Sequence, residues 1–251
     1  MKITSSLCFT QLVYQSLPTE TKSGRLVLMR LNKYLAVAGV ASRRSADEMI
    51  KLGQVKINGK VVKEMGVKVD VEKDVITVDG KKVQLEPNIV TYLLNKPRGV
   101  ISTADDPEHR KTVLDLVPKS PRVFPCGRLD ENTMGLVILT NDGNLCYQLT
   151  HPKFEHQKEY IVHGRSKTPE AALEIIRRGV RLADGPIKVD ALEVIRISHQ
   201  KVEFKVTIHE GRNHLVRRLC AAVAIEIDGL TRVRVGDYEL GDIEPGKYKQ
   251  V

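Results

Sequence analysis

Residues 201–210, KVEFKVTIHE, alternate apolar and polar side chains with a period of two residues. That alternation is typical of an antiparallel strand with one face buried and the other in water. Further strand-like segments occur at 89–95, 135–140, 158–164 and 230–236, and helical patterns separate them in no regular strand–helix–strand order. We therefore expect an α+β fold with a mixed, largely antiparallel sheet flanked by helices.

A smaller unit precedes these segments. Apolar residues at helical spacing predict helices over 30–39 and 42–53, and each pattern ends at a glycine. Asn-Gly and Asp-Gly pairs lie inside 54–62 and 75–85, between short strand-like runs. Such pairs are strong signals for two-residue hairpins. The sequence thus predicts two helices followed by small β-hairpins.

We expect four parts along the chain. Residues 1–28 are expected to be a disordered extension, because polar residues interrupt their apolar stretch and no signal peptide is evident. Residues 29–85 form the small unit, 86–90 a linker and 91–251 the larger domain. Met29 opens a well-patterned helix, so it is a candidate translation start, as an alternative to the first methionine.

The charge of the chain points to an anionic partner. The net charge is +9 and the isoelectric point is near 9.3, and nucleic acid is the commonest partner of such proteins. Residues 30–60 hold seven basic and two acidic residues. Arg43 and Arg44 fall in the first turn of the second helix, where free N–H groups favour phosphate. With Arg30 and Lys33 they are our candidate RNA-binding residues, although a solvated basic face would show the same pattern.

The composition disfavours several kinds of site. The four cysteines form no C-x-x-C pair and the seven histidines show no metal-ligand spacing, so we expect no metal site and no disulfide framework. Reduced thiols suit the cytoplasm. No apolar run is long enough to span a bilayer, so we expect no membrane partner. We also expect a monomer.

The stretch GRLDENTMGLVILTNDG, residues 127–143, places Asp130 directly after Gly-Arg-Leu. By itself, an aspartate in a glycine-containing turn is most often a turn former or a cap. However, Arg128 lies two residues earlier, the run EGRNHLVRR at 210–218 is basic, and Tyr160 is an aromatic residue in a chain with 4% aromatics. A carboxylate, an arginine that keeps it ionised and a flat ring together suit the binding and covalent attack of a flipped-out base.

Four motifs in order make the chain resemble the RsuA/RluB-type pseudouridine synthases. Residues 127–143 resemble their G-R-L-D-x-x-T-x-G-L-L-x-L-T-N-D-G signature. The other three matches are LLNKPRGVIST with N-K-P-x-G, EHQKEYIVHG with K-x-Y, and EGRNHLVRRLC with E-G-R-N-R-Q-V-R-R-M. The alpha-L RNA-binding domain that precedes the catalytic domain in this family resembles residues 30–62. The resemblance covers about residues 29–245.

The resemblance implies an enzyme of the isomerase class that converts uridine to pseudouridine and needs no cofactor. Whether its aspartate adds to the ribose, adds to the base or removes a ribose proton stays open. The resemblance implies that Asp130 is the nucleophile, that Tyr160 stacks on the base and that Arg217 pairs with the aspartate. It also implies that Arg128 fills the gap left by the flipped base, that Lys158 is the lysine of the K-x-Y motif and that Leu230 is an apolar residue under the base.

Departures from the family pattern include two positions in and after the last motif. Leu215 stands where the family usually has Gln, and Ala224 stands where Gly is common. We expect these changes to alter local RNA contacts or a turn. Neither change touches the aspartate, the tyrosine or the arginine with an implied role, so we expect activity.

The resemblance implies ribosomal RNA or a pre-ribosomal particle as the partner, with large-subunit RNA favoured over the alternatives. Three alternatives stay open. They are a non-catalytic RNA-binding or ribosome-assembly protein, a synthase acting on small-subunit ribosomal RNA, and a synthase acting on transfer RNA.

Overall fold

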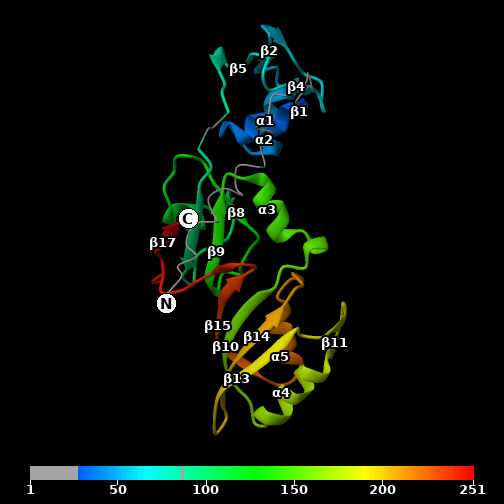
Figure 1. Ribbon diagram of the computed structural model, residues 1–251, viewed down its shortest axis with the longest axis vertical. Helices are drawn as coiled ribbons and strands as arrows, with labels where there is room; N and C mark the ends of the chain where they lie inside the picture. The colour runs from blue at the N-terminus through cyan, green and yellow to red at the C-terminus, as the bar shows by residue number, and fades with distance from the viewer. Residues whose placement is uncertain (1–27, 86–87) are drawn as a thin grey trace, which may run out of the picture. The chain divides into compact units, whose positions relative to one another are not determined.

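The computed structural model describes residues 28–85 and 88–251, and the chain forms two compact units that divide after Pro87. Figure 1 shows the smaller unit in blue and cyan and the larger unit from green to red. The expected N-terminal extension lies outside the described residues except for Leu28, and two residues of the expected linker also lie outside them. Each unit contains its own hydrophobic core.

The smaller unit consists of two helices and two small sheets. The helices are α1, Leu31–Val37, and α2, Arg43–Lys51. Strand β1, Leu28–Arg30, pairs antiparallel with β4, Lys68–Asp70. The other sheet has the order β3–β2–β5–β6, with β2 at Val55–Ile57, β3 at Lys60–Val61, β5 at Ile76–Val78 and β6 at Lys81–Lys82. The two predicted helices and the two predicted hairpins are confirmed.

Local chemistry explains these elements. Asn58 and Gly59, between β2 and β3, have φ angles of 50° and 81°, as a type I′ turn requires. Asp79 and Gly80 repeat that geometry with φ angles of 48° and 80°. Ser42 Oγ accepts a hydrogen bond of 3.1 Å from the backbone N–H three residues later, which caps the start of α2. These short-range interactions determine both hairpins and the start of the second helix.

The larger unit is organised around a nine-stranded sheet. Among its described residues, seven strands follow the order β13–β14–β10–β15–β9–β7–β17, while β16 pairs with β15 and β8 with β9. The bounds are β7 Thr91–Lys96, β8 Phe124–Cys126, β9 Met134–Thr140, β10 Lys158–Arg165, β13 Ala191–Ser198, β14 Lys201–Ile208, β15 Glu226–Val235, β16 Tyr238–Glu239 and β17 Tyr248–Gln250. Strands β9 and β15 are parallel, whereas the other pairs are antiparallel. The predicted mixed, largely antiparallel sheet is confirmed.

Helices and short elements complete the larger unit. The helices are α3, Gly143–Thr150, α4, Pro169–Arg178, and α5, Leu215–Ala222. Two 3₁₀ turns are η2, Val113–Leu116, and η3, Pro152–Phe154, and a small ribbon joins β11, Val180–Leu182, to β12, Gly185–Ile187. Figure 1 shows α4 and α5 beside β10, β13 and β14. The apolar face of β14 and the apolar stripes of α4 and α5 share one core. Helices therefore flank the sheet as predicted.

Strand β9 is buried on both faces. Val137 and Leu139 belong to the core that α4 and α5 cover, whereas Leu136 and Ile138 belong to a second cluster with α3. Successive side chains of a strand point to opposite faces, so one continuous apolar run fills both layers. This firmly packed strand follows directly on the loop that carries Asp130.

Some elements of the larger unit have no counterpart among the sequence patterns. Strands β11, β12 and β13 all lie in the segment between α4 and β14, for which we made no prediction. Across residues 28–85 and 88–251, no helix is long and apolar enough to cross a membrane.

Candidate active site

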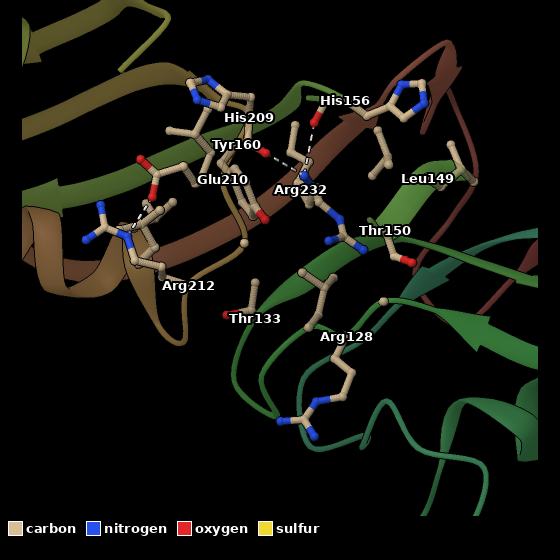
Figure 2. A pocket seen from close by; sticks show the side chains of 18 of the residues that line it. Arg128, Thr133, Leu149, Thr150, His156, Tyr160, His209, Glu210, Arg212 and Arg232 are labelled. Atoms are coloured by element: carbon tan, nitrogen blue, oxygen red, sulfur yellow. Dashed lines mark hydrogen bonds and ion pairs between the residues drawn. The ribbon is translucent and has the colours of Figure 1, made fainter. Parts of the chain in front are cut away.

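A cavity of about 720 Å³ opens in the larger unit. Its walls come from the loop before β9, the segment after α3, strands β10 and β15, and the region from the end of β14 to α5. Figure 2 shows side chains from these separate segments converging on one space. The volume is in the range of cavities that hold small molecules or a single nucleotide.

Asp130 lies in the loop between β8 and β9 and lines this cavity. Backbone contacts hold the loop on both sides of it. The N–H of Leu129 donates to Ser102 Oγ at 3.2 Å, and the N–H of Thr133 donates to the carbonyl of Asp130 at 3.0 Å. The carboxylate itself remains about one third exposed, with a side-chain exposure of 35%. The backbone is therefore fixed while the carboxylate can meet a ligand.

Lys96, at the end of β7, binds the backbone of the same loop. Its side chain is fully buried, and its Nζ donates to the carbonyls of Pro97, Val100 and Glu131 at 3.0, 2.7 and 3.0 Å. Three ammonium donors thus meet three acceptors. Burial lowers the pKa of Lys96 to about 8, although the charges of Asp130 and Glu131 oppose that shift. We did not single out this lysine from the sequence. The signal that could have identified it is a basic residue directly after an apolar run of strand residues.

Two basic side chains face the Asp130 carboxylate. His214 Nε2 lies 3.3 Å from Oδ1, and Arg217 Nε lies 3.8 Å from Oδ2. Arg217 also donates through Nη2 to the carbonyl of Asn132 at 2.9 Å and to Thr133 Oγ1 at 3.1 Å. The arginine therefore binds the loop as well as the carboxylate, and each carboxylate oxygen lies beside a different basic side chain.

His214 is a second residue that we did not single out. It stands directly before α5 with a φ of 51°, in the left-handed region. The signal was in the motif comparison, because the family motif has Arg where this chain has His214. A basic residue at that position is placed to contact the aspartate.

Tyr160 and Leu230 supply the apolar part of the cavity. Tyr160 comes from β10 and Leu230 from β15, and both are buried while still lining the cavity. The two strands are adjacent in the sheet, which brings together residues far apart in the sequence. Figure 2 shows Tyr160 in the interior of the site. An aromatic ring beside an aliphatic residue suits the face of a planar base.

Positive charge lies deep in the same cavity. Lys158 Nζ donates to the carbonyls of His156 and His209 at 2.9 and 3.0 Å. Burial and the nearby charge of Arg232 lower the pKa of Lys158. Arg232 is 4% exposed, and its Nε donates to the carbonyl of Leu136 at 2.9 Å. This buried arginine is a third residue that we did not single out, because the sequence indicated only a strand over residues 230–236.

The remaining predicted residues are spread more widely. Arg128 is exposed and lies at the edge of the cavity, and Figure 2 shows its guanidinium pointing away from Tyr160. In the smaller unit, Arg30, Arg43 and Arg44 are exposed and Lys33 is half-buried. The structure therefore brings five of the six predicted catalytic-domain residues around the interior of one cavity and places Arg128 at its edge. These six residues are Asp130, Arg128, Lys158, Tyr160, Arg217 and Leu230.

Metal ligands do not cluster in the portion of the chain that the structure covers: no group of three or more His, Cys, Asp or Glu side chains there could hold an ion. The charged groups of the cavity are instead the carboxylates of Asp130, Glu155 and Glu210 among lysine and arginine side chains. That arrangement suits binding of a polar ligand and attack by a carboxylate.

Comparison with protein families identifies the chain. The family model for RNA pseudouridylate synthase matches residues 90–222, and the model for the S4 domain matches residues 29–76. The chain belongs to the RNA pseudouridylate synthase family. It is 41% identical over 226 residues to an uncharacterized RNA pseudouridine synthase of Aquifex aeolicus, with 89% of this chain and 90% of that protein covered.

Two further relatives of this synthase extend the comparison. Ribosomal large subunit pseudouridine synthase B of Bacillus subtilis is 43% identical over 226 residues, which cover 88% of this chain and 91% of that protein. A crystal structure of a pseudouridylate synthase matches with a TM-score of 0.60 and 30% identity, and covers 89% of this chain and 96% of that one. The resemblance, the α+β fold class and the isomerase class are thereby confirmed, and the two matched families indicate an RNA substrate.

Proposed function

We propose that this synthase isomerises a specific uridine of ribosomal RNA, more specifically of the large subunit, to pseudouridine, with Asp130 as the nucleophile acting on a flipped-out nucleotide. One observation carries the proposal. The carboxylate of Asp130 lines a cavity of about 720 Å³ that also holds a buried tyrosine ring, and it faces the side chains of His214 and Arg217. A uridine cannot enter such a cavity while it is stacked in a helix, so it must be flipped out of the RNA.

The isomerisation needs no oxidant, reductant or group donor. The bond between N1 of the base and C1′ of the ribose breaks, and a bond between C5 and C1′ forms. The proton on C5 leaves, and N1 takes up a proton, so that product and substrate have the same composition. A nucleophilic carboxylate divides this difficult exchange into two easier steps. Addition to the ribose, addition to the base and abstraction of a ribose proton all remain compatible with the position of Asp130.

Each neighbour of Asp130 has a role in this proposal. Arg217 keeps the carboxylate ionised and oriented. Tyr160 and Leu230 hold the faces of the uracil, which must stay bound while it rotates between the two bonds. Lys158 places positive charge beside the uracil or its phosphate. The apolar walls of the cavity also shield the detached base from water.

The residues at the outside of the site bind RNA in this proposal. Arg128 at the cavity edge fills the gap that the flipped base leaves in the RNA. Arg30, Lys33, Arg43 and Arg44 contact the phosphate backbone from the unit that matches the S4 domain.

The choice of ribosomal RNA rests on relatives. The Bacillus subtilis relative and a relative in Xanthomonas campestris are both named ribosomal large subunit pseudouridine synthase B. We further propose that the enzyme works as a cytoplasmic monomer. The three described cysteines, Cys126, Cys146 and Cys220, are free thiols, which suits a reducing compartment.

The test is a map of pseudouridines in total RNA from cells with and without the gene. The gene is then restored as wild type, as Asp130→Asn or as Glu131→Gln. Glu131 is the matched control, because it is the adjacent carboxylate and its side chain does not line the cavity. We expect one or a few large-subunit sites to depend on the gene, to be restored by wild type and Glu131→Gln, and to stay unmodified with Asp130→Asn.

Other results would correct or overturn the proposal. Gene-dependent sites confined to small-subunit or transfer RNA would replace the proposed target while leaving the reaction intact. Full restoration by Asp130→Asn would show that Asp130 is not the nucleophile. If no pseudouridine depended on the gene, the proposed activity would be wrong.

A further inference from the structure

An aromatic cluster lies on the surface beside the cavity. It consists of Tyr147 on α3, His151 directly after α3, and Lys153 and Phe154 in η3, and we call it the α3–η3 platform. The ring centroids of Tyr147 and His151 are 4.8 Å apart, and those of Tyr147 and Phe154 are 5.7 Å apart. Lys153 Nζ lies 5.0 Å from the centroid of Tyr147 and 4.6 Å from that of Phe154. These four side chains therefore form one continuous surface of adjacent rings that carries polar groups.

The platform exposes more aromatic surface than packing of α3 requires. Tyr147 is 46% exposed and Phe154 is 39% exposed. The contact of α3 with the core is made instead by Leu145, Cys146 and Leu149 on the other side of the helix. Exposed aromatic rings are costly to keep in water, so a cluster of them marks an interaction surface. This is notable in a chain with 4% aromatic residues.

The platform is continuous with the candidate active site. His151 and its neighbour Pro152 line the cavity, and so does His156, whose ring is 6.2 Å from that of Phe154. Figure 2 shows Thr150 and His156 on the side of the cavity where α3 ends. A nucleotide chain that delivers one base to Asp130 must leave the cavity across some part of its rim, and this rim is aromatic.

The chemistry of the platform fits a nucleotide. Every base has a π-face, and stacking on Tyr or Phe holds unpaired bases without reading their sequence. Lys153 adds positive charge above the rings. His151 Nδ1 accepts a hydrogen bond of 3.2 Å from the N–H of Lys153, which leaves Nε2 as the ring nitrogen that can donate. Stacking faces, a cation and a donor are the groups that hold a base and its phosphate.

We infer that the α3–η3 platform stacks an unpaired base of the substrate RNA that neighbours the target uridine. This inference rests on the proposed function, since it needs an RNA whose uridine occupies the cavity. The platform thereby determines which RNA contexts deliver a uridine. A target uridine in a loop or bulge, with an unpaired neighbour, binds better than one whose neighbours are both paired.

The test compares leucine and aromatic variants of the full chain. Tyr147→Leu with Phe154→Leu keeps apolar bulk but removes both π-faces, whereas Tyr147→Phe with Phe154→Tyr keeps them. The matched control is Tyr248→Leu, because Tyr248 on β17 is also 41% exposed but does not line the cavity. Thermal unfolding of each variant checks that the unit stays folded.

The probe is the single-stranded RNA AAAAUAAAA, carrying a fluorophore at one end, and two versions with an abasic nucleotide directly before or after the uridine. We expect the double leucine variant to bind the intact RNA about tenfold more weakly. The aromatic pair and Tyr248→Leu should bind as wild type does. Wild type should bind one of the abasic versions about as weakly as the double leucine variant binds the intact RNA. The double leucine variant should bind that abasic version with the same affinity as the intact RNA.

Two results would overturn the inference. The double leucine variant binding the intact RNA like wild type would remove the platform from recognition. If the double leucine variant bound both abasic versions more weakly than wild type, by the same factor as it bound the intact RNA, the platform would have a structural role only. These failures are distinguishable from failure of the proposed function, which is read from wild type in the pseudouridine map. If wild type modifies no RNA, the proposed function and this inference both fall.

Discussion

The imidazole of His214 approaches the carboxylate of Asp130 more closely than the guanidinium of Arg217 does. The distances are 3.3 Å from Nε2 to Oδ1 and 3.8 Å from Nε to Oδ2. Each side chain contacts one carboxylate oxygen, His214 from the residue directly before α5 and Arg217 from within that helix. Both contacts to the Asp130 carboxylate therefore come from α5 and the residue before it, and they can be tested separately.

Replacing His214 should lower the rate moderately. The contact is half exposed, and such ion pairs contribute less than about 1 kcal/mol, so we expect His214→Ala to reduce kcat roughly fivefold with little change in KM. His214→Arg keeps a cation at this position and should retain most of the activity. Release of tritium from C5-tritiated uridine in the substrate RNA measures the rate. An Ala variant as active as wild type would limit His214 to a structural role.

Arg217 should be far less replaceable. Its guanidinium holds Asp130 and also donates to Asn132 and Thr133, and a lysine ammonium cannot reproduce that fork. We expect Arg217→Lys to lower kcat roughly 100-fold, because a displaced loop misplaces the nucleophile. The same tritium-release assay applies, with Arg218→Lys as the matched control, since that neighbouring arginine pairs with Asp184. Equal losses in the two variants would contradict the special role of Arg217.

Lys96 should stabilise the unit in a pH-dependent way. Lys96→Met leaves three buried carbonyls without their donor, so we expect a loss of roughly 2–4 kcal/mol in the free energy of unfolding at pH 7. The folded-state pKa of Lys96 is lowered to about 8, below the ordinary value of 10.5. Between these values the unfolded chain holds more protons, so stability rises with pH.

The difference between wild type and Lys96→Met should therefore widen from pH 8 to pH 10.5. The difference in unfolding free energy should increase by about 3 kcal/mol once the Lys96 amine is neutral in both the folded and the unfolded state. Urea unfolding of both proteins at pH 7, 8.5 and 10 measures the difference, and groups common to both proteins cancel. A difference that stays constant or shrinks as pH rises would show that the buried lysine does not resist protonation.

Ala224 should be replaceable by glycine with a gain in stability. It follows α5 with a φ of 56°, where a side chain other than glycine costs about 1 kcal/mol. We expect Ala224→Gly to raise the melting temperature of this unit by about 2–4 °C. Ala221→Gly, inside the same helix, should lower it, because glycine weakens a helix interior. A fall in melting temperature with Ala224→Gly would contradict the strain argument.

The basic residues of the smaller unit should govern the salt dependence of RNA binding. Arg43→Ala with Arg44→Ala removes two exposed charges at the start of α2. We expect weaker affinity for the substrate RNA and a plot of log affinity against log salt that is shallower by about 1.5. Arg177→Ala with Arg178→Ala, on α4, removes the same charge from another surface and serves as control. Equal slopes for all three proteins would remove Arg43 and Arg44 from phosphate binding.

Local signals in the sequence determined much of the fold. The Asn58-Gly59 and Asp79-Gly80 pairs specified both hairpins, because only a few residue types accept the positive φ angles of those turns. The alternation of β14 identified its buried face, since a strand points successive side chains to opposite sides. The signature 127–143 identified the family and with it the candidate nucleophile. Each of these properties depends on residues close together in the chain.

Tertiary structure alone decided what surrounds Asp130. Lys96 and Arg232 looked like ordinary residues at the end and in the middle of strands. Only the pairing of β7, β9 and β15 brings Lys96 to the loop of Asp130 and Arg232 to the cavity wall. His214 reaches the aspartate because a left-handed residue turns the chain into α5. The electrostatics of a site depend on distances between charges, and those distances are fixed by packing between segments far apart in the sequence. The sequence by itself therefore determined these local elements and the candidate nucleophile, whereas packing between distant segments decided which basic side chains face it.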